Sequence, residues 1–229
     1  PVLLSELLAD DIEYTKELLA TDLNYPHVNG IPELRKNIAN LYDNASPDNV
    51  LVTVGAIEAN YLTVRSLLNA GDEIVIMLPN YMQIWGIAEE MGCIPKAFHL
   101  REENDWKPDL QELRSLVTKN TKMIAICNPN NPTGYTLTKE EMQEIVAIAK
   151  SVDAWVYCDE VYRGAALDGN IRESFISLYD KVMVNGGLSK AYALPGLRLG
   201  WLIGPEEVIA DTWAYHDYTS ITAGIMSHF

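Results

Sequence analysis

The sequence predicts an α/β protein: a mainly parallel central sheet of about seven strands with helices on both faces. The first observation is a series of short apolar runs of strand length, which alternate with helical patterns along the chain. The second is the absence of repeats, low-complexity tracts and long linkers. The runs that we assign to strands are 50–54, 73–78, 94–100, 122–127, 154–159 and 181–186.

The helical patterns follow from the spacing of apolar residues. In 30–42, Leu34, Ile38 and Leu41 recur on one helical face. The segment 56–71 is a second predicted helix, which we expect Gly71 to end. Further helical patterns separate most of the strands, at 82–91, 109–118 and 138–150.

Composition excludes several classes of partner. The chain has 229 residues with 48% hydrophobic and 21% charged residues, and its net charge is −15. Such a negative charge repels nucleic acids and anionic membranes, so we expect neither as a partner. No apolar run reaches the roughly 18 residues of a membrane span, and the acidic N-terminus lacks the basic region of a signal peptide.

Cysteine and histidine usage indicates a reducing compartment and no metal. Three cysteines lie far apart, each in or beside an apolar stretch: Cys93, Cys127 and Cys158. We expect buried, reduced thiols and a cytoplasmic protein. No metal-ligand spacing relates the four histidines His27, His99, His216 and His228.

Polar motifs follow the ends of the predicted strands. Ligands of such sheets gather at the carboxyl ends of the strands, so these motifs together predict a site. They are GAIEAN (55–60), PNY (79–81), NPNNPTG (128–134), DEVYRG (159–164) and NGGLSK (185–190).

Each motif alone has a second interpretation. The turn at Gly55 leads into a helix and can bind an anion, yet many strand-to-helix turns look the same. NPNNPTG can aim asparagine side chains or simply form a rigid loop. Asp159 is either a buried carboxylate that needs a partner or a helix N-cap.

Lys190 lies in an apolar, glycine-rich segment with no carboxylate near it in sequence. Such surroundings disfavour an ammonium group, and a Schiff base with an aldehyde would remove that charge. The alternative is an ordinary lysine in a surface loop.

Together the motifs resemble pyridoxal-phosphate enzymes of fold type I, and more narrowly class I/II aminotransferases. DEVY begins 28 residues after Asn131, and Lys190 of SKAYALPGLRLGW follows Asp159 by 31 residues. The upstream segment NYPHVNGIPELRKNIANLY is also similar to that family. The resemblance covers nearly the whole chain.

The resemblance implies roles around the cofactor ring. Lys190 matches the lysine that forms the Schiff base with pyridoxal 5'-phosphate and then moves the proton from the substrate Cα to the cofactor. Asp159 matches the carboxylate that pairs with the pyridinium nitrogen and keeps the ring an electron sink. Tyr162 and Asn131 match the groups that bond the ring's phenolate oxygen, and Tyr81 matches the aromatic ring stacked on the cofactor.

The resemblance also implies a phosphate site. The backbone of Gly55, Ala56 and Ile57 matches the phosphate cradle, Arg198 matches the arginine that clamps the phosphate, and Ser189 is a further hydroxyl within reach.

Two positions bear on assembly and on specialisation. Tyr25 matches a tyrosine that reaches the partner subunit's phosphate, which implies a homodimer with a shared active site. Gly187 departs from the pattern, because many relatives have a phosphate-binding serine there; this change favours a specialised subgroup.

The resemblance divides the chain into two parts. We expect 1–45 to be an N-terminal segment with interface and partner-site contributions, and 46–229 to be the cofactor-binding large domain. Relatives run further, into a C-terminal small domain. We therefore expect a large domain from a longer protein, or a shortened form, that is weakly active on its own.

The implied function is an aminotransferase that moves an amino group between an amino acid and a 2-oxo acid. A lyase, a decarboxylase or a cyclising synthase on the same scaffold is the alternative, and a non-catalytic ligand-sensing domain is a third. The sequence does not identify the amino acid.

Overall fold

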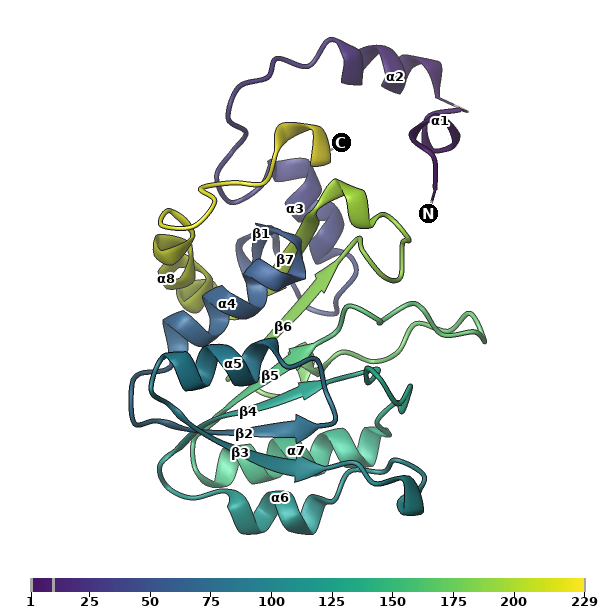
Figure 1. The fold of residues 1–229 in the computed structure, drawn as a ribbon. Helices are drawn as coiled ribbons and strands as arrows, with labels where there is room; N and C mark the ends of the chain where they lie inside the picture. The colour runs from purple at the N-terminus through teal and green to yellow at the C-terminus, as the bar shows by residue number, and fades with distance from the viewer. Residues whose placement is uncertain (1, 10, 229) are drawn as a thin grey trace.

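A computed structural model describes residues 2–9 and 11–228 (Figure 1). Its centre is a seven-stranded sheet in the order β1-β7-β6-β5-β4-β2-β3. The strands are β1 (Val50–Val54), β2 (Glu73–Leu78), β3 (Ile94–His99), β4 (Thr121–Cys127), β5 (Trp155–Asp159), β6 (Val182–Gly187) and β7 (Leu199–Ile203).

The sheet is mainly parallel, as predicted. Pairs β2–β3, β2–β4, β4–β5 and β5–β6 are parallel, whereas β7 runs antiparallel between β1 and β6. Strand β7 lies outside the ranges predicted from the sequence. Its letters, LGWLI, contain a glycine and directly follow the Arg198 motif, so they lack the continuous apolar signature of the other runs.

Helices cover both faces of the sheet, which confirms the predicted fold class. One buried cluster lies under α4 (Gly55–Leu67), α5 (Gln83–Glu90) and α8 (Glu206–His216). The opposite cluster lies under α3 (Pro32–Ala39), α6 (Leu110–Leu116) and α7 (Lys139–Ser151). Side chains of β5 alternate between them: Tyr157 belongs to the first, and Val156 and Cys158 to the second.

The end of α4 differs from the expectation. The helix stops at Leu67 instead of continuing to Gly71, because Leu68 is extended (φ −120°, ψ 150°) and buries its side chain. Gly71 instead forms a separate turn at φ +89°, where its N–H donates to the Gly92 carbonyl at 2.8 Å. A glycine tolerates that left-handed backbone without strain.

Short helices complete the chain. The N-terminal α1 (Leu4–Leu7) and α2 (Ile12–Leu19) lie apart from the sheet at the top of Figure 1. Five 3-10 turns join the remaining elements: η1 (Pro47–Asn49), η2 (Glu102–Asn104), η3 (Phe175–Ser177), η4 (Pro195–Leu197) and η5 (Ile225–Ser227).

The predicted thiol state is confirmed. All three cysteines are buried and free of disulfide bonds: Cys93, Cys127 and Cys158. Among residues 2–9 and 11–228, no helix has the length and apolar character needed to cross a bilayer.

Candidate active site

The carboxyl ends of the parallel strands meet a cavity of about 290 Å³. Its wall contains nearly all of the residues that the sequence analysis selected, from five separate motifs. The lining residues are Ala56, Ile57, Asn60, Tyr81, Cys127, Asn131, Asp159, Val161, Tyr162, Ser189, Lys190, Pro195 and Arg198.

Two of the predicted residues do not line this cavity. Gly55 lies directly against the Arg198 guanidinium at its edge: an ideal Cβ on Gly55 would be 2.6 Å from Arg198 Nη2. Tyr25 lies on the segment between α2 and α3 and is 80% exposed. Its predicted role is to reach the phosphate site of a second subunit.

Asp159 ends β5 and is buried at the cavity wall, with 7% of its surface exposed. Its Oδ1 accepts from the Val161 N–H at 3.2 Å. Burial raises the pKa of Asp159, while hydrogen bonds from Val161, Asn60 and Asn185, and the charge of Lys190, act in the opposite direction. The carboxylate therefore has neutral hydrogen-bond donors and only a distant cation, so a cationic ring nitrogen would complete its surroundings.

A buried amide network behind Asp159 was missed by the sequence analysis. Asn60 Oδ1 accepts from the Tyr157 hydroxyl at 2.6 Å and from Asn185 Nδ2 at 2.7 Å. Asn60 Nδ2 donates to Gln83 Oε1 at 2.9 Å, and Gln83 Nε2 donates to the Ile57 carbonyl at 2.7 Å. This network links Asp159 to the start of α4.

Sequence offered a weak signal for that network. Asn60 belongs to the motif GAIEAN and is a polar residue in a predicted helix. Asn185 begins the motif NGGLSK at the end of a predicted strand. Tyr157 and Gln83 carried no such signal, because a tyrosine in an apolar run and a glutamine at a helix start are ordinary.

The part of the cavity wall formed by Arg198 is cationic. The Arg198 side chain crosses the N-terminus of α4, held by Nη1 donating to the Pro195 carbonyl at 3.1 Å and to Ser189 Oγ at 3.5 Å. Gly55 has φ +71°, and its lack of a side chain lets the guanidinium approach. Free N–H groups of a helix start beside an arginine form a site for an anion such as a phosphate.

Gly187 lies close to the start of α4, near Arg198 and Gly55. An ideal Cβ there would lie 3.7 Å from the Ala56 nitrogen and 3.2 Å from the Leu199 carbonyl oxygen. A serine at this position would direct its hydroxyl toward the α4 N-terminus but would crowd β7. The glycine leaves Ser189 as the hydroxyl at this end of the cavity.

Lys190 follows β6 in a turn that is exposed, so the expectation of apolar surroundings around its ammonium is wrong. The reason is that the buried glycines Gly186 and Gly187 belong to β6, whereas Lys190 lies in the turn that follows the strand, where its side chain is not covered. Its Nζ lies 5.9 Å from the centre of the Tyr162 ring, which places it over the cavity wall.

In the NPNNPTG loop Asn131 lines the cavity, whereas the side chains of the other two asparagines form hydrogen bonds within the protein. Asn128 Oδ1 accepts from the Leu137 N–H at 3.0 Å, and Asn130 accepts from Thr133 while donating to the Pro79 carbonyl at 3.1 Å. Tyr81 also lines the cavity and is 52% exposed, so its ring is available to a planar ligand.

These features fit pyridoxal phosphate group by group. The glycine-floored helix start and Arg198 suit a phosphate, and the Tyr81 ring suits a flat heterocycle. Asp159 suits a protonated ring nitrogen, and Lys190 supplies an amine for the aldehyde.

The fold and cavity define an α/β protein with a lysine-bearing site at the carboxyl edge of its sheet. The family described as aminotransferase class I and II matches residues 11–214. The chain belongs to this family.

Curated relatives carry aminotransferase names. An aspartate aminotransferase of Pyrococcus horikoshii is 35% identical over 195 residues, which cover 82% of this chain and 50% of the relative. A putative aminotransferase of Bacillus subtilis, YugH, is 33% identical over 86% of this chain and 52% of its own length. The chain thus spans about half the length of these relatives.

Solved structures agree with the fold. A PLP-dependent aminotransferase from Streptococcus suis superposes with a TM-score of 0.94 at 38% identity, over 99% of this chain and 61% of that one. A Thermus thermophilus aspartate aminotransferase variant gives a TM-score of 0.88 at 26% identity, over 94% of this chain and 62% of the other.

Proposed function

We propose that this protein is a pyridoxal-phosphate-dependent aminotransferase, which moves an amino group between an amino acid and a 2-oxo acid. The single observation that carries the proposal is the gathering of Lys190, Asp159 and Arg198 around one cavity of about 290 Å³. An amine, a buried carboxylate and an anion clamp at one sheet edge are the three groups that this cofactor requires.

The residues divide the work of holding the cofactor. Arg198, Ser189 and the N–H groups of Gly55, Ala56 and Ile57 would bind its phosphate. Tyr81 would cover the ring, while Asn131 and Tyr162 would hydrogen-bond its phenolate oxygen. Pyridoxal phosphate, when bound, supplies a reactive aldehyde and a ring that accepts electrons from the substrate Cα.

Lys190 and Asp159 carry the chemistry. Lys190 would hold the cofactor's aldehyde through its Nζ, and once the substrate's amine has taken that place, the free Lys190 amine would accept a proton from the substrate Cα and give it back, as a general base and acid. The Asp159 carboxylate stabilises a protonated ring nitrogen, and Asn60 and Asn185 keep that carboxylate in place.

We further propose a cytoplasmic homodimer with a shared site. The N-terminal segment 1–45 would contribute to the interface, with Tyr25 reaching the partner subunit's phosphate site. The 80% exposure of Tyr25 and its absence from the lining of its own chain's cavity support this arrangement. The buried free cysteines support a reducing compartment.

Product analysis tests the reaction type. The protein is loaded with pyridoxal phosphate and incubated with single amino acids in turn. Transamination predicts one 2-oxo acid and one aminated cofactor for each amino acid consumed. Release of ammonia or CO2, with the cofactor unchanged, would favour the lyase or decarboxylase alternative; a product that has lost a leaving group and closed a ring would favour the cyclising synthase.

A further inference from the structure

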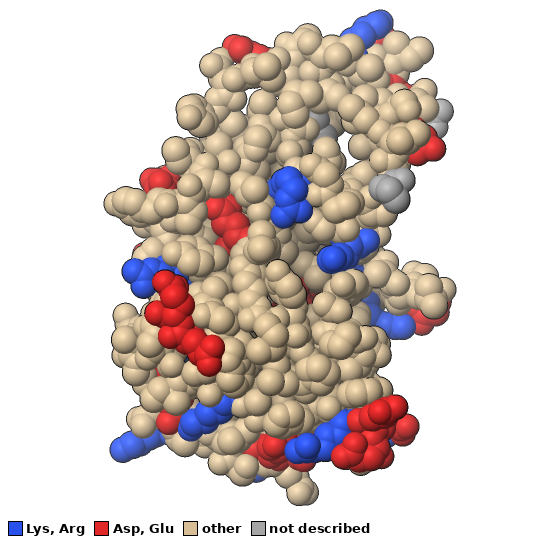
Figure 2. Space-filling model, in the orientation of Figure 1, with Lys and Arg blue, Asp and Glu red and all other residues tan. Residues whose placement is uncertain are grey.

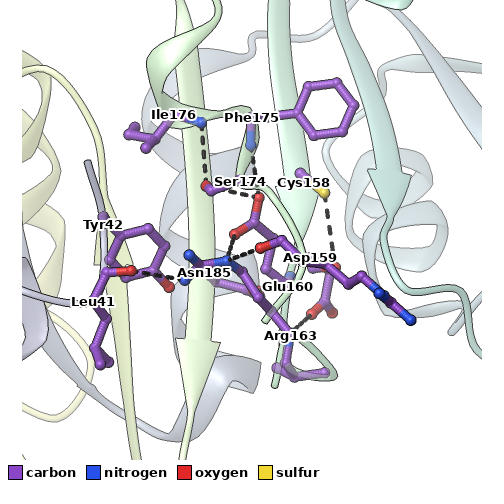
Figure 3. Close-up of polar contacts among 12 residues, drawn as sticks. Leu41, Tyr42, Cys158, Asp159, Glu160, Arg163, Ser174, Phe175, Ile176 and Asn185 are labelled. Atoms are coloured by element: carbon purple, nitrogen blue, oxygen red, sulfur yellow. Dashed lines mark hydrogen bonds and ion pairs between the residues drawn. The ribbon is translucent and has the colours of Figure 1, made fainter. Parts of the chain in front are cut away.

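Glu160 is a buried carboxylate to which the proposed function assigns no role. It directly follows Asp159, and only 2% of its surface is exposed. Successive side chains of an extended segment point to opposite faces of the sheet. Asp159 accordingly lines the cavity, whereas the Glu160 carboxylate faces Ser174, Phe175 and Arg163 behind it (Figure 3).

One oxygen of Glu160 accepts hydrogen bonds from Ser174 and Phe175, which follow the mostly exposed loop 164–173. Oε1 accepts from the Ser174 hydroxyl at 2.9 Å and from the Phe175 N–H at 3.0 Å. Phe175 is fully buried and begins η3, so this contact ties the turn after β5 to the core. A neutral side chain without an acceptor would leave both donors unpaired in the interior, which is costly.

The other oxygen faces a cation. Glu160 Oε2 has no hydrogen-bond partner within the described part of the chain and lies 4.0 Å from Arg163 Nε. Arg163 is itself fixed by donating Nε to the Arg172 carbonyl at 2.7 Å and Nη1 to the Leu41 carbonyl at 3.0 Å. Its guanidinium also lies 4.7 Å from the centre of the Tyr42 ring.

Glu160 and Arg163 therefore join three segments: Leu41 and Tyr42, which follow α3, the turn after β5 and the stretch 172–175. The turn itself is short, with the Arg163 N–H donating to the Glu160 carbonyl at 2.8 Å. Glu160 also donates its backbone N–H to Asn185 Oδ1 at 3.0 Å. Tyr162 lies inside this turn and lines the cavity.

We propose that Glu160, acting with Arg163, is a positioning residue that fixes the 159–163 turn so that Asp159 and Tyr162 both face the cofactor cavity. The inference rests on the proposed function, since it concerns how the same site is shaped. Glu160 acts from behind the turn and does not line the cavity that contains Asp159 and Lys190.

The test compares three variants with wild type: Glu160→Ala, Glu160→Gln and the control Glu141→Ala. Glu141 is a matched carboxylate, because it accepts from the Tyr135 hydroxyl at 2.8 Å and the Thr138 N–H at 2.8 Å, away from the cavity. The readouts are the dissociation constant for pyridoxal phosphate and the pH midpoint of the bound cofactor's absorbance change.

Glu160→Ala should weaken cofactor binding by about tenfold and raise the pH midpoint. The midpoint rises because a displaced Tyr162 no longer stabilises the cofactor's phenolate anion, so Tyr162→Phe should shift it in the same direction. Glu160→Gln should stay within about twofold of wild type, since its amide oxygen still accepts from Ser174 and Phe175. Glu141→Ala should change neither readout.

Wild-type affinity and midpoint in Glu160→Ala would overturn the proposal, and so would an equal shift in Glu141→Ala. If Glu160→Ala does not fold, Arg163→Met takes its place: it must raise the midpoint for the proposal to stand, and an unchanged midpoint refutes it. Absence of cofactor binding by the wild type would instead contradict the proposed function, and this inference with it.

Discussion

At the scale of single residues, the site depends on hydrogen bonds made behind its wall. The buried carboxylate of Asp159 accepts hydrogen bonds from amides on α4 and β6, and these amides orient it. Asn60 is the centre of that arrangement, because one oxygen accepts two hydrogen bonds in a fully buried position. Buried polar networks of this kind are stable only when every member is paired.

Asn60→Ala should lower the free energy of unfolding by about 2 kcal/mol, because the Tyr157 hydroxyl and the Asn185 amide lose their acceptor in the interior. Urea denaturation of the cofactor-free protein measures this change. Gln83→Ala is the control: it removes two hydrogen bonds at the more exposed rim of the same network, where water can replace them, and should cost less than about 1 kcal/mol. Equal costs for the two variants would mean that Asn60 is not the centre of the network.

The sequence predicted the residues that line the cavity better than those that support them. Motifs at strand ends contained the groups that line the cavity, because parallel strands bring their carboxyl ends together. Supporting contacts such as Tyr157 to Asn60 span 97 residues of sequence, and no local pattern encodes such a distance. The surroundings of Lys190 were mispredicted for a similar reason, since local apolar letters do not determine exposure.

At the scale of elements, the phosphate end of the site depends on how β7 packs on the start of α4. Gly200 in β7 lies so close to this helix that an ideal Cβ would be 2.4 Å from both the Ala56 nitrogen and the Gly55 carbonyl carbon. The opposing atoms are backbone, so neither side can yield without moving an element. The close approach sets where the free N–H groups of α4 lie relative to Arg198.

Gly200→Ala should destabilise the protein by about 1–3 kcal/mol through overpacking, and should also weaken phosphate binding by displacing the helix start. Thermal unfolding and titration with inorganic phosphate measure the two effects. Gly196→Ala is the matched control on η4, where an added Cβ meets nothing within 4 Å. A Gly200→Ala protein with wild-type stability would contradict this account of the packing.

Elements with strong periodicity were predictable, whereas the end of α4 and the strand β7 were not. Six strands lie close to their predicted ranges. The end of α4 at Leu67 escaped prediction because burial of Leu68, a tertiary effect, overrode the helical pattern. Strand β7 escaped because the close approach to α4 requires a glycine that interrupts its apolar run.

At the scale of the whole molecule, a strongly acidic protein carries a local cationic site. The net charge is −15, yet basic side chains lie near the middle of the face shown in Figure 2. Lys190 and Arg198 belong to the same cavity, where the α4 N-terminus adds its partial positive charge. The overall charge repels polyanions, while the two cations at the cavity attract one small anion.

The central claim is that Lys190 bonds covalently to pyridoxal phosphate in this cavity. The direct measurement is the visible absorbance band of the protein mixed with this cofactor, before and after sodium borohydride, followed by mass analysis of the reduced peptide. The account predicts a band that borohydride removes, a cofactor adduct on Lys190 and no such band in Lys190→Ala. An equal band in Lys190→Ala, or an adduct on another lysine, would contradict it.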